Sequence, residues 1–386
     1  MHILISPNAF KNSIDAGAAA LAIKEGLQQS KLKCECECFP VGDGGDGTGD
    51  LIISKLAGTL VSTEVNDPLG RKIKASFGLI DKGDTAVIEM ANASGLKLLR
   101  PGELNPLFAT SYGTGEQIRL AFDNGAKKII IGMGGSATVD GGYGILKALG
   151  ARFLNARGKD IDKLPGSFKE LHSIELAGLD PRIAESEIIV LCDVDNKLLG
   201  THGAAKIFGP QKGASAQAVQ QLEGGLAKFS IVAFHQTGRD MAEVKYGGTA
   251  GGAAAGLYAI LNAKLVNGID YFLRLTDFEK SLENNDLVIT GEGSIDEQTL
   301  QGKAPFGVAL HAKQMGLPVI GLAGRLPLEI HETLHQYFDV LMPISHEPLD
   351  IATAIQCTSS NLKRTAFELG NLLAVKNNEL ILRSFQ

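Results

Sequence analysis

Residues 2–47 read HILISPNAFKNSIDAGAAALAIKEGLQQSKLKCECECFPVGDGGDG, and this stretch predicts a strand, a helix and a second strand. The apolar run His2–Ser6 predicts the first strand. Residues 12–15 (NSID) are typical of a helix start, and an alanine-rich run follows them. Lys33–Val41 alternates as a strand does and leads into a glycine loop. Since consecutive parallel strands need a crossover helix, we expect a parallel sheet with helices on its faces.

The same alternation returns near the C-terminus, whereas the middle of the chain has a different pattern. Apolar runs at Asp286–Thr290 and Pro318–Leu322 predict two further strands. In the middle, strands are separated by turns such as residues 67–70 (DPLG), which predicts hairpins. Farther on, Thr114 and Gln117 have the spacing of a capping box at the start of a helix.

The length of 386 residues exceeds what one hydrophobic core usually serves, so two domains are expected. We expect an α/β fold with a Rossmann-like, three-layer, parallel-sheet domain formed by both chain ends, residues 1–64 and 284–386. Residues 65–283 are expected to form an inserted mixed α/β domain with Gly-rich loops. Because no linker separates the two, the active site is expected in the cleft between them.

Composition indicates a small-molecule enzyme. A net charge of −6 gives no electrostatic footprint for nucleic acid or for an anionic membrane, both of which need clustered Lys and Arg. The first residues lack the pattern of a signal peptide, and no apolar stretch reaches the length of a membrane span, so we expect a cytoplasmic protein. A homodimer remains open.

Glycine and acidic or amide residues gather in short loops, several of them directly after an apolar run. These loops are residues 42–47 (GDGGDG, the first glycine loop), 132–142 (GMGGSATVDGG, the second glycine loop), 192–196, 209–213, 247–252 and 290–296. In an open α/β sheet the binding crevice lies where strands end. The loops therefore predict one polar site.

Both glycine loops fit the spacing of a dinucleotide fingerprint, but only the second suits an anion. Asp43 and Asp46 in the first loop would repel a pyrophosphate at close range. In the second loop, backbone N–H groups with the Ser136 and Thr138 hydroxyls are expected to cradle a phosphate at a helix N-terminus. The alternative is that the glycines only serve a tight turn.

Lysines and carboxylates near these loops are the candidates for chemistry. Lys212 and Lys303 stand beside glycine or proline, and a Walker A loop is absent, so basic side chains of this kind must hold any nucleotide phosphate. The loop carboxylates can hold Mg²⁺ or accept a proton. Helix capping is the alternative for Asp140 and Asp296. Asp193 directly follows a buried strand and is the first choice for the catalytic base.

Several stretches resemble the type-1 glycerate kinases, nearly end to end and in order: residues 6–11 (SPNAFK), 42–48, 67–70, 110–115 (TSYGTG), 131–142, 208–214 and 290–303. The resemblance implies transfer of the ATP γ-phosphoryl group to a hydroxyl of glycerate, commonly at C2. It also implies a two-domain fold with a Rossmann-like domain made from both chain ends.

The resulting hypothesis is an ATP- and Mg²⁺-dependent kinase that phosphorylates D-glycerate. The expected catalytic residues are Asp193, Lys303 and Lys11, and the expected metal ligands are Asp296 and Glu292. Substrate or phosphate is expected to contact Asp43, Gly44, Gly45, Asp46, Gly134, Gly135, Ser136, Thr138, Asp140, Lys212, Gly291, Glu292 and Gly293.

Two other functions stay open at this point. The two glycine fingerprints are compatible with an NAD-dependent oxidoreductase that acts on a small hydroxy acid. The chain also has Asn8 where the resembled family usually has Asp, and Ser294 where Arg is usual, which suggests a catalytically weakened relative that binds a sugar acid.

Overall fold

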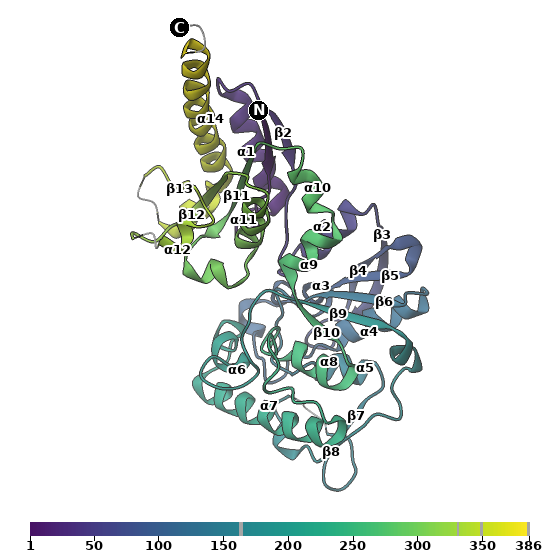
Figure 1. The fold of residues 1–386 in the computed structure, drawn as a ribbon. Coiled ribbons are helices and arrows are strands. Elements are labelled where there is room, and N and C mark those ends of the chain that lie inside the picture. The colour runs from purple at the N-terminus through teal and green to yellow at the C-terminus, as the bar shows by residue number, and fades with distance from the viewer. Residues whose placement is uncertain (162–164, 330–331, 348–349, 384–386) are drawn as a thin grey trace. The chain divides into compact units, whose positions relative to one another are not determined.

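The structure is a computed structural model that describes residues 1–161, 165–329, 332–347 and 350–383. The chain divides into two compact units (Figure 1). Unit 1 contains Met1–Asp43 and Ile269–Gln386, and unit 2 contains Gly44–Gly268. Residues 44–64, which the sequence analysis assigns to the domain of the chain ends, belong to unit 2, where β3 pairs with β4.

Unit 1 is built on a parallel sheet with the strand order β13-β12-β11-β1-β2. Its strands are β1 (His2–Ile5), β2 (Glu35–Cys38), β11 (Leu287–Ser294), β12 (Val319–Arg325) and β13 (Val340–Pro343). Counted along the chain within the unit, this order is 2-1-3-4-5, which is a doubly wound arrangement. Its switch point lies between β1 and β11, and such sheets bind ligands beyond the carboxyl ends at that point.

Helices cover both faces of this sheet, as the α/β prediction expects. The helices of unit 1 are α1 (Ala16–Gln29), α9 (Gly268–Leu275), α10 (Phe278–Leu282), α11 (Ala304–Gln314), α12 (Glu332–His335), α13 (Ile351–Gln356) and α14 (Thr358–Arg383). Ile3 and Ile5 share a core cluster with α1 and α14 on one face. α11 packs on β11 and β12. α1 and α14 touch backbone to backbone, since a Cβ on Gly26 would lie 2.1 Å from the Lys363 carbonyl oxygen.

Unit 2 contains a mixed sheet with the order β10-β9-β6-β5-β4-β3. Its strands are β3 (Thr59–Asn66), β4 (Lys72–Ile80), β5 (Thr85–Glu89), β6 (Lys128–Gly132), β9 (Glu187–Cys192) and β10 (Lys264–Asn267). β3, β4 and β5 form the predicted antiparallel hairpins, whereas β5, β6, β9 and β10 are parallel. The carboxyl ends of the parallel strands therefore share one edge.

The helices of unit 2 and a small hairpin complete its core. The helices are α2 (Thr48–Lys55), α3 (Met90–Ser94), α4 (Tyr112–Asp123), α5 (Tyr143–Ala148), α6 (Ala204–Phe208), α7 (Ala216–Thr237) and α8 (Ala253–Leu261). The hairpin pairs β7 (Arg152–Leu154) with β8 (Ser173–Glu175). Inside the core, Phe168 stacks on Phe229 with ring centroids 5.2 Å apart. Both rings belong to one hydrophobic cluster with buried residues of β5, β6 and β9.

Two neighbouring glycines of α7 give opposite predictions for stability. A Cβ on Gly225 would lie 2.9 Å from the Phe168 Cβ, whereas a Cβ on Gly224 would meet nothing within 4 Å. We expect Gly225→Ala to lower the free energy of unfolding by about 1–3 kcal/mol through overpacking. Gly224→Ala should raise it by up to about 1 kcal/mol through helix propensity. Urea denaturation of both variants checks this, and equal shifts would contradict the packing.

Candidate active site

Polar side chains cluster around the carboxyl ends of β1, β2 and β11 in unit 1, beside the switch point between β1 and β11. Asn8 follows β1, and its side-chain amide donates to Asp43 Oδ2 at 3.1 Å. Both residues are buried. The Asn8 backbone N–H also donates to the Gly291 carbonyl oxygen at 2.8 Å, which ties this segment to β11. Asn8, Asp43 and β11 therefore meet in the place where such a sheet binds its ligand.

Glu292 in β11 is the buried carboxylate of this cluster. Its Oε1 accepts a hydrogen bond from the Thr299 hydroxyl at 3.3 Å and lies 3.9 Å from Lys303 Nζ. Burial raises the pKa of Glu292 to about 7, the charge of Asp43 adds to this rise, and Lys303 and Lys11 oppose it. A carboxyl group with such a pKa can take up or release a proton near neutral pH.

Two lysines and one aspartate predicted for the site flank Glu292. Lys303 is the N-cap residue of α11, and its side chain is partly exposed. Lys11 is exposed. Asp296 is the N-cap of the short 3₁₀ helix Glu297–Gln301, and its Oδ1 accepts from the Gln298 backbone N–H at 3.0 Å. The capping that the sequence analysis gives as the alternative for Asp296 is thus present.

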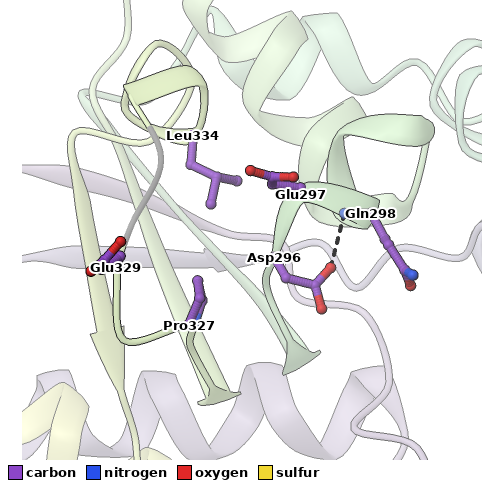
Figure 2. Close-up of a pocket in the computed structure, with 6 residues that line it drawn as sticks. All are labelled: Asp296, Glu297, Gln298, Pro327, Glu329 and Leu334. Atoms are coloured by element: carbon purple, nitrogen blue, oxygen red, sulfur yellow. Dashed lines mark hydrogen bonds between the residues drawn. The ribbon is translucent and has the colours of Figure 1, made fainter.

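A cavity of about 350 Å³ lies beside this 3₁₀ helix (Figure 2). Its lining residues are Asp296, Glu297, Gln298, Pro327, Glu329 and Leu334. Within the part of the chain that the structure describes, no group of three or more His, Cys, Asp or Glu side chains could hold a metal ion. In the same part, no helix is long and apolar enough to cross a membrane.

The two glycine loops contact each other at the carboxyl edge of the unit 2 sheet. The backbone N–H groups of Met133 and Gly134 both donate to the Gly44 carbonyl oxygen, at 3.1 and 2.9 Å. A Cβ on Gly134 would lie 2.3 Å from the Asp46 backbone nitrogen, so Gly134 must be a glycine for this approach. The Gly134 N–H, expected to face a phosphate, is thus directed at the first glycine loop.

Lys212 places its amine at the second glycine loop from inside the unit. The residue ends the 3₁₀ helix Pro210–Lys212 and is only 3% exposed. Its Nζ donates to Ser136 Oγ at 2.9 Å and to the Thr138 carbonyl oxygen at 2.8 Å. Burial lowers the pKa of Lys212 to about 7, and the charges of Asp140 and Asp193 partly oppose this. An amine of this kind can bind an anion as an ammonium ion.

Asp140 and Asp193 have different surroundings beside Lys212. Asp140 is fully buried and accepts hydrogen bonds from the Ser111 N–H and hydroxyl, at 2.9 and 2.7 Å. It also accepts from the N–H groups of Gly142 and Gly144 at the start of α5. Asp193 directly follows β9 and is half-buried. Asp140 therefore fastens the loop to the start of α5, which begins at Tyr143.

Glu89, the last residue of β5, is a buried carboxylate that was not among the predicted site residues. Glu89 is 4% exposed, and its Oε1 accepts from the Gly49 N–H at 2.6 Å while its Oε2 accepts from the Gly47 N–H at 3.1 Å. Burial raises the pKa of Glu89 to about 7. The signal was present, because a carboxylate at the end of an apolar strand is also what drew attention to Asp193.

The buried Lys212 amine leads to a prediction about pH. Above pH 7 the folded protein gives up this proton, whereas the unfolded chain keeps it up to the ordinary pKa of 10.5. The unfolded state then binds more protons, so the free energy of unfolding rises with pH. From pH 7 to 10 we expect a gain on the order of a few kcal/mol relative to Lys212→Met, measured by urea denaturation. Parallel pH dependences of the two proteins would contradict this.

The solved and curated relatives define the class of the protein as a kinase. A crystal structure described as a glycerate kinase 2 from Salmonella typhimurium LT2 matches with a TM-score of 0.81 and 40% identity, over 98% of this chain and 99% of that chain. Glycerate 2-kinase of Escherichia coli is 40% identical over 97% of this chain and 98% of its own length. Glycerate kinase of Bacillus subtilis is 41% identical, with coverages of 96% and 97%.

The chain belongs to the glycerate kinase family, whose family model matches residues 3–374. This confirms the kinase hypothesis over the NAD-dependent oxidoreductase. Membership implies ATP as the phosphate donor and a small molecule as the acceptor.

Proposed function

We propose that the protein transfers the γ-phosphoryl group of ATP to the C2 hydroxyl of D-glycerate, giving 2-phosphoglycerate and ADP. The observation that carries this proposal is the match over 97% of the chain, at 40% identity, to a protein named glycerate 2-kinase. The geometry supports it, because amines lie near carboxylates in each unit. In unit 1 these are Lys303 and Glu292, and in unit 2 they are Lys212 with Asp140 and Asp193. Phosphoryl transfer relies mainly on such positioning and on charge stabilisation.

The exposure of each lysine indicates which part of the substrates it binds. The more exposed amines of Lys11 and Lys303 suit the phosphates of ATP. The buried Lys212, whose amine donates to the Ser136 hydroxyl and to the Thr138 carbonyl oxygen, suits the carboxylate of a small acid. Asp193 is proposed as the group that orients the acceptor hydroxyl and takes its proton.

The proposed reaction is a direct transfer to the hydroxyl. The hydroxyl oxygen of glycerate forms a bond to the γ-phosphorus, and the bond from that phosphorus to the β–γ bridging oxygen breaks. ADP leaves with the electron pair of the broken bond, and the hydroxyl proton passes to the carboxylate of Asp193. The lysines stabilise the negative charge that develops on the phosphoryl oxygens.

Kinases take ATP together with Mg²⁺, and the donor set of unit 1 fits this cation. Mg²⁺ prefers oxygen ligands and is commonly held by one or two carboxylates and by phosphate oxygens. The charge of Asp43 raises the pKa of Glu292, and a divalent cation would relieve this repulsion. Glu292 and Asp43 would therefore hold the ion, with Asp296 as a further candidate. When bound, the ion neutralises part of the phosphate charge.

We propose that the two compact units are the two predicted domains, with residues 44–64 in unit 2 and residues 269–283 in unit 1. An active site in a cleft shared by these domains is likewise a proposal. A homodimer and a cytoplasmic location are likewise predictions from the sequence alone.

One assay tests the proposed function. Purified protein is incubated with ATP, Mg²⁺ and D-glycerate, ADP release is followed, and the product is identified by phosphorus NMR. We expect metal-dependent ADP release and the signal of 2-phosphoglycerate, whereas 3-phosphoglycerate would overturn the assignment of the hydroxyl. If glycerate raises the melting temperature without any ADP release, the protein is the weakened acid-binding relative instead.

A further inference from the structure

The carboxylate of Glu89 lies at the N-terminus of α2 and takes the place of a missing cap. α2 has Gly47 as its N-cap residue, and glycine brings no side chain that could bond the free N–H groups of the first turn. Glu89 bonds the N–H groups of Gly47 and Gly49 from a different strand, β5. A carboxylate is favoured at this end of a helix by the helix dipole.

Glycine at position 49 is what allows Glu89 to approach α2. A Cβ on Gly49 would lie 2.6 Å from Glu89 Cγ, so only glycine allows the carboxylate to reach the helix at this point. At the other end of the loop, the Gly44 carbonyl oxygen accepts from the second glycine loop, and the Gly44 N–H donates to Thr48 Oγ1 at 3.0 Å. The segment from Gly44 to Gly47 is therefore fixed at both ends.

We propose that Glu89 is a positioning residue for phosphoryl transfer, whose carboxylate fixes the Gly44–Gly47 segment in the form that meets the substrate. This inference rests on the proposed function and on the sequence-based prediction that Gly44, Gly45 and Asp46 contact substrate or phosphate. Glu89 acts through the N–H groups of Gly47 and Gly49, because its own carboxylate is buried and directed at them.

The ionised form of Glu89 is the one that holds the segment. Both oxygens of a carboxylate accept hydrogen bonds, whereas protonation turns one of them into a donor. The charged groups around it are Asp50 on α2 and Asp46 in the first glycine loop, and both favour the protonated form. Asp46 is itself paired with Lys97 at 3.2 Å. Acidification is thus expected to loosen the segment before the protein unfolds.

The test compares Glu89→Gln with a matched variant, Glu116→Gln. Glu116 is also buried and also accepts from a backbone N–H, that of Asn66 at 2.6 Å, but it lies on α4. We expect Glu89→Gln to speed amide hydrogen exchange in residues 44–50 and to lower kcat/KM at least 10-fold. It should also shift the acidic limb of the kcat/KM pH profile relative to wild type, because Glu89 no longer contributes to it. Glu116→Gln should leave both the amide hydrogen exchange of residues 44–50 and the acidic limb of the kcat/KM pH profile unchanged.

Three outcomes decide the proposal. Unchanged exchange in residues 44–50 of Glu89→Gln would overturn the positioning role, whatever the activity. Faster exchange with wild-type kcat/KM and an unshifted acidic limb would overturn the link to phosphoryl transfer. If the wild-type protein releases no ADP with glycerate, the proposed function fails and the link to phosphoryl transfer fails with it. The exchange comparison would still show whether Glu89 holds the segment.

Discussion

Replacing Lys212 by methionine is expected to lower kcat/KM for phosphoryl transfer by about 10²- to 10³-fold, which corresponds to roughly 3–4 kcal/mol of transition-state stabilisation. Methionine has a similar length and leaves the buried site filled, so the fold should persist. The variant lacks the amine that donates to Ser136 Oγ and to the Thr138 carbonyl oxygen. It therefore also lacks the buried group that carries a positive charge when protonated beside Asp140 and Asp193.

The control for this prediction is Lys206→Met on the neighbouring helix α6. Lys206 is 42% exposed, and its amine lies 3.7 Å from Glu223, outside the polar cluster. An exposed ion pair of this kind contributes little, so both activity and stability should stay close to wild type. Steady-state kinetics with varied glycerate and varied ATP separate the two substrates. If both variants lose activity equally, Lys212 has no special role.

Gly134→Ala is expected to damage both stability and catalysis. The added Cβ would lie 2.3 Å from the Asp46 backbone nitrogen and 2.4 Å from the Gly45 Cα. Because backbone meets backbone there, neither loop can rotate a side chain out of the way. We expect a loss of about 3 kcal/mol in the free energy of unfolding, at the upper end for overpacking, and a loss of at least 10-fold in kcat/KM.

Gly132→Ala is the matched control, two residues earlier at the end of β6. A Cβ there would have ordinary contacts, with the Gly44 carbonyl oxygen at 3.7 Å and Glu89 Cγ at 3.9 Å. This variant should fold and turn over as the wild type does. Chemical denaturation and kcat/KM are measured for both variants. A tolerated Gly134→Ala would show that the loops are not held against each other in solution.

The parallel sheet of unit 1 was predictable because β1, β11 and β12 contain short apolar runs bounded by glycine or polar residues, and β2 alternates as a strand does. His2–Ser6 corresponds to β1 (His2–Ile5). Asp286–Thr290 corresponds to β11, which continues to Ser294 because its last residues pair with β12 up to Arg325. The predicted loop at 290–296 is therefore partly strand. Periodicity does not reveal such an extension, since the partner strand lies far along the chain.

The capping box of Thr114 and Gln117 was wrong for a similar reason. α4 begins at Tyr112, and Thr114 is buried with its hydroxyl 2.7 Å from that of Ser94. Gln117 donates its side-chain amide to the Ser76 carbonyl oxygen at 3.0 Å. Both side chains serve contacts with other elements, and local spacing carries no information about them.

The candidate site shows the same limit. Lys212, Ser136 and Thr138 were predicted for the site, and the structure brings them together. It did not reveal that Asp140 accepts from Ser111, 29 residues earlier, or that the first glycine loop accepts the Gly134 N–H. Residue types at strand ends indicate where polar groups gather. Which of those groups bond the protein itself depends on loop geometry.

The discontinuity of unit 1 bears on how the chain folds during synthesis. Unit 2 is one continuous segment and can close while the ribosome is still adding residues. β1 and β2 must wait for β11, roughly ten seconds to a minute later at ordinary elongation rates. A chain that stops before β11 would leave the backbone N–H and C=O groups along one edge of β1 unpaired and available for aggregation. The last helix to emerge, α14, then closes on α1, one of the first.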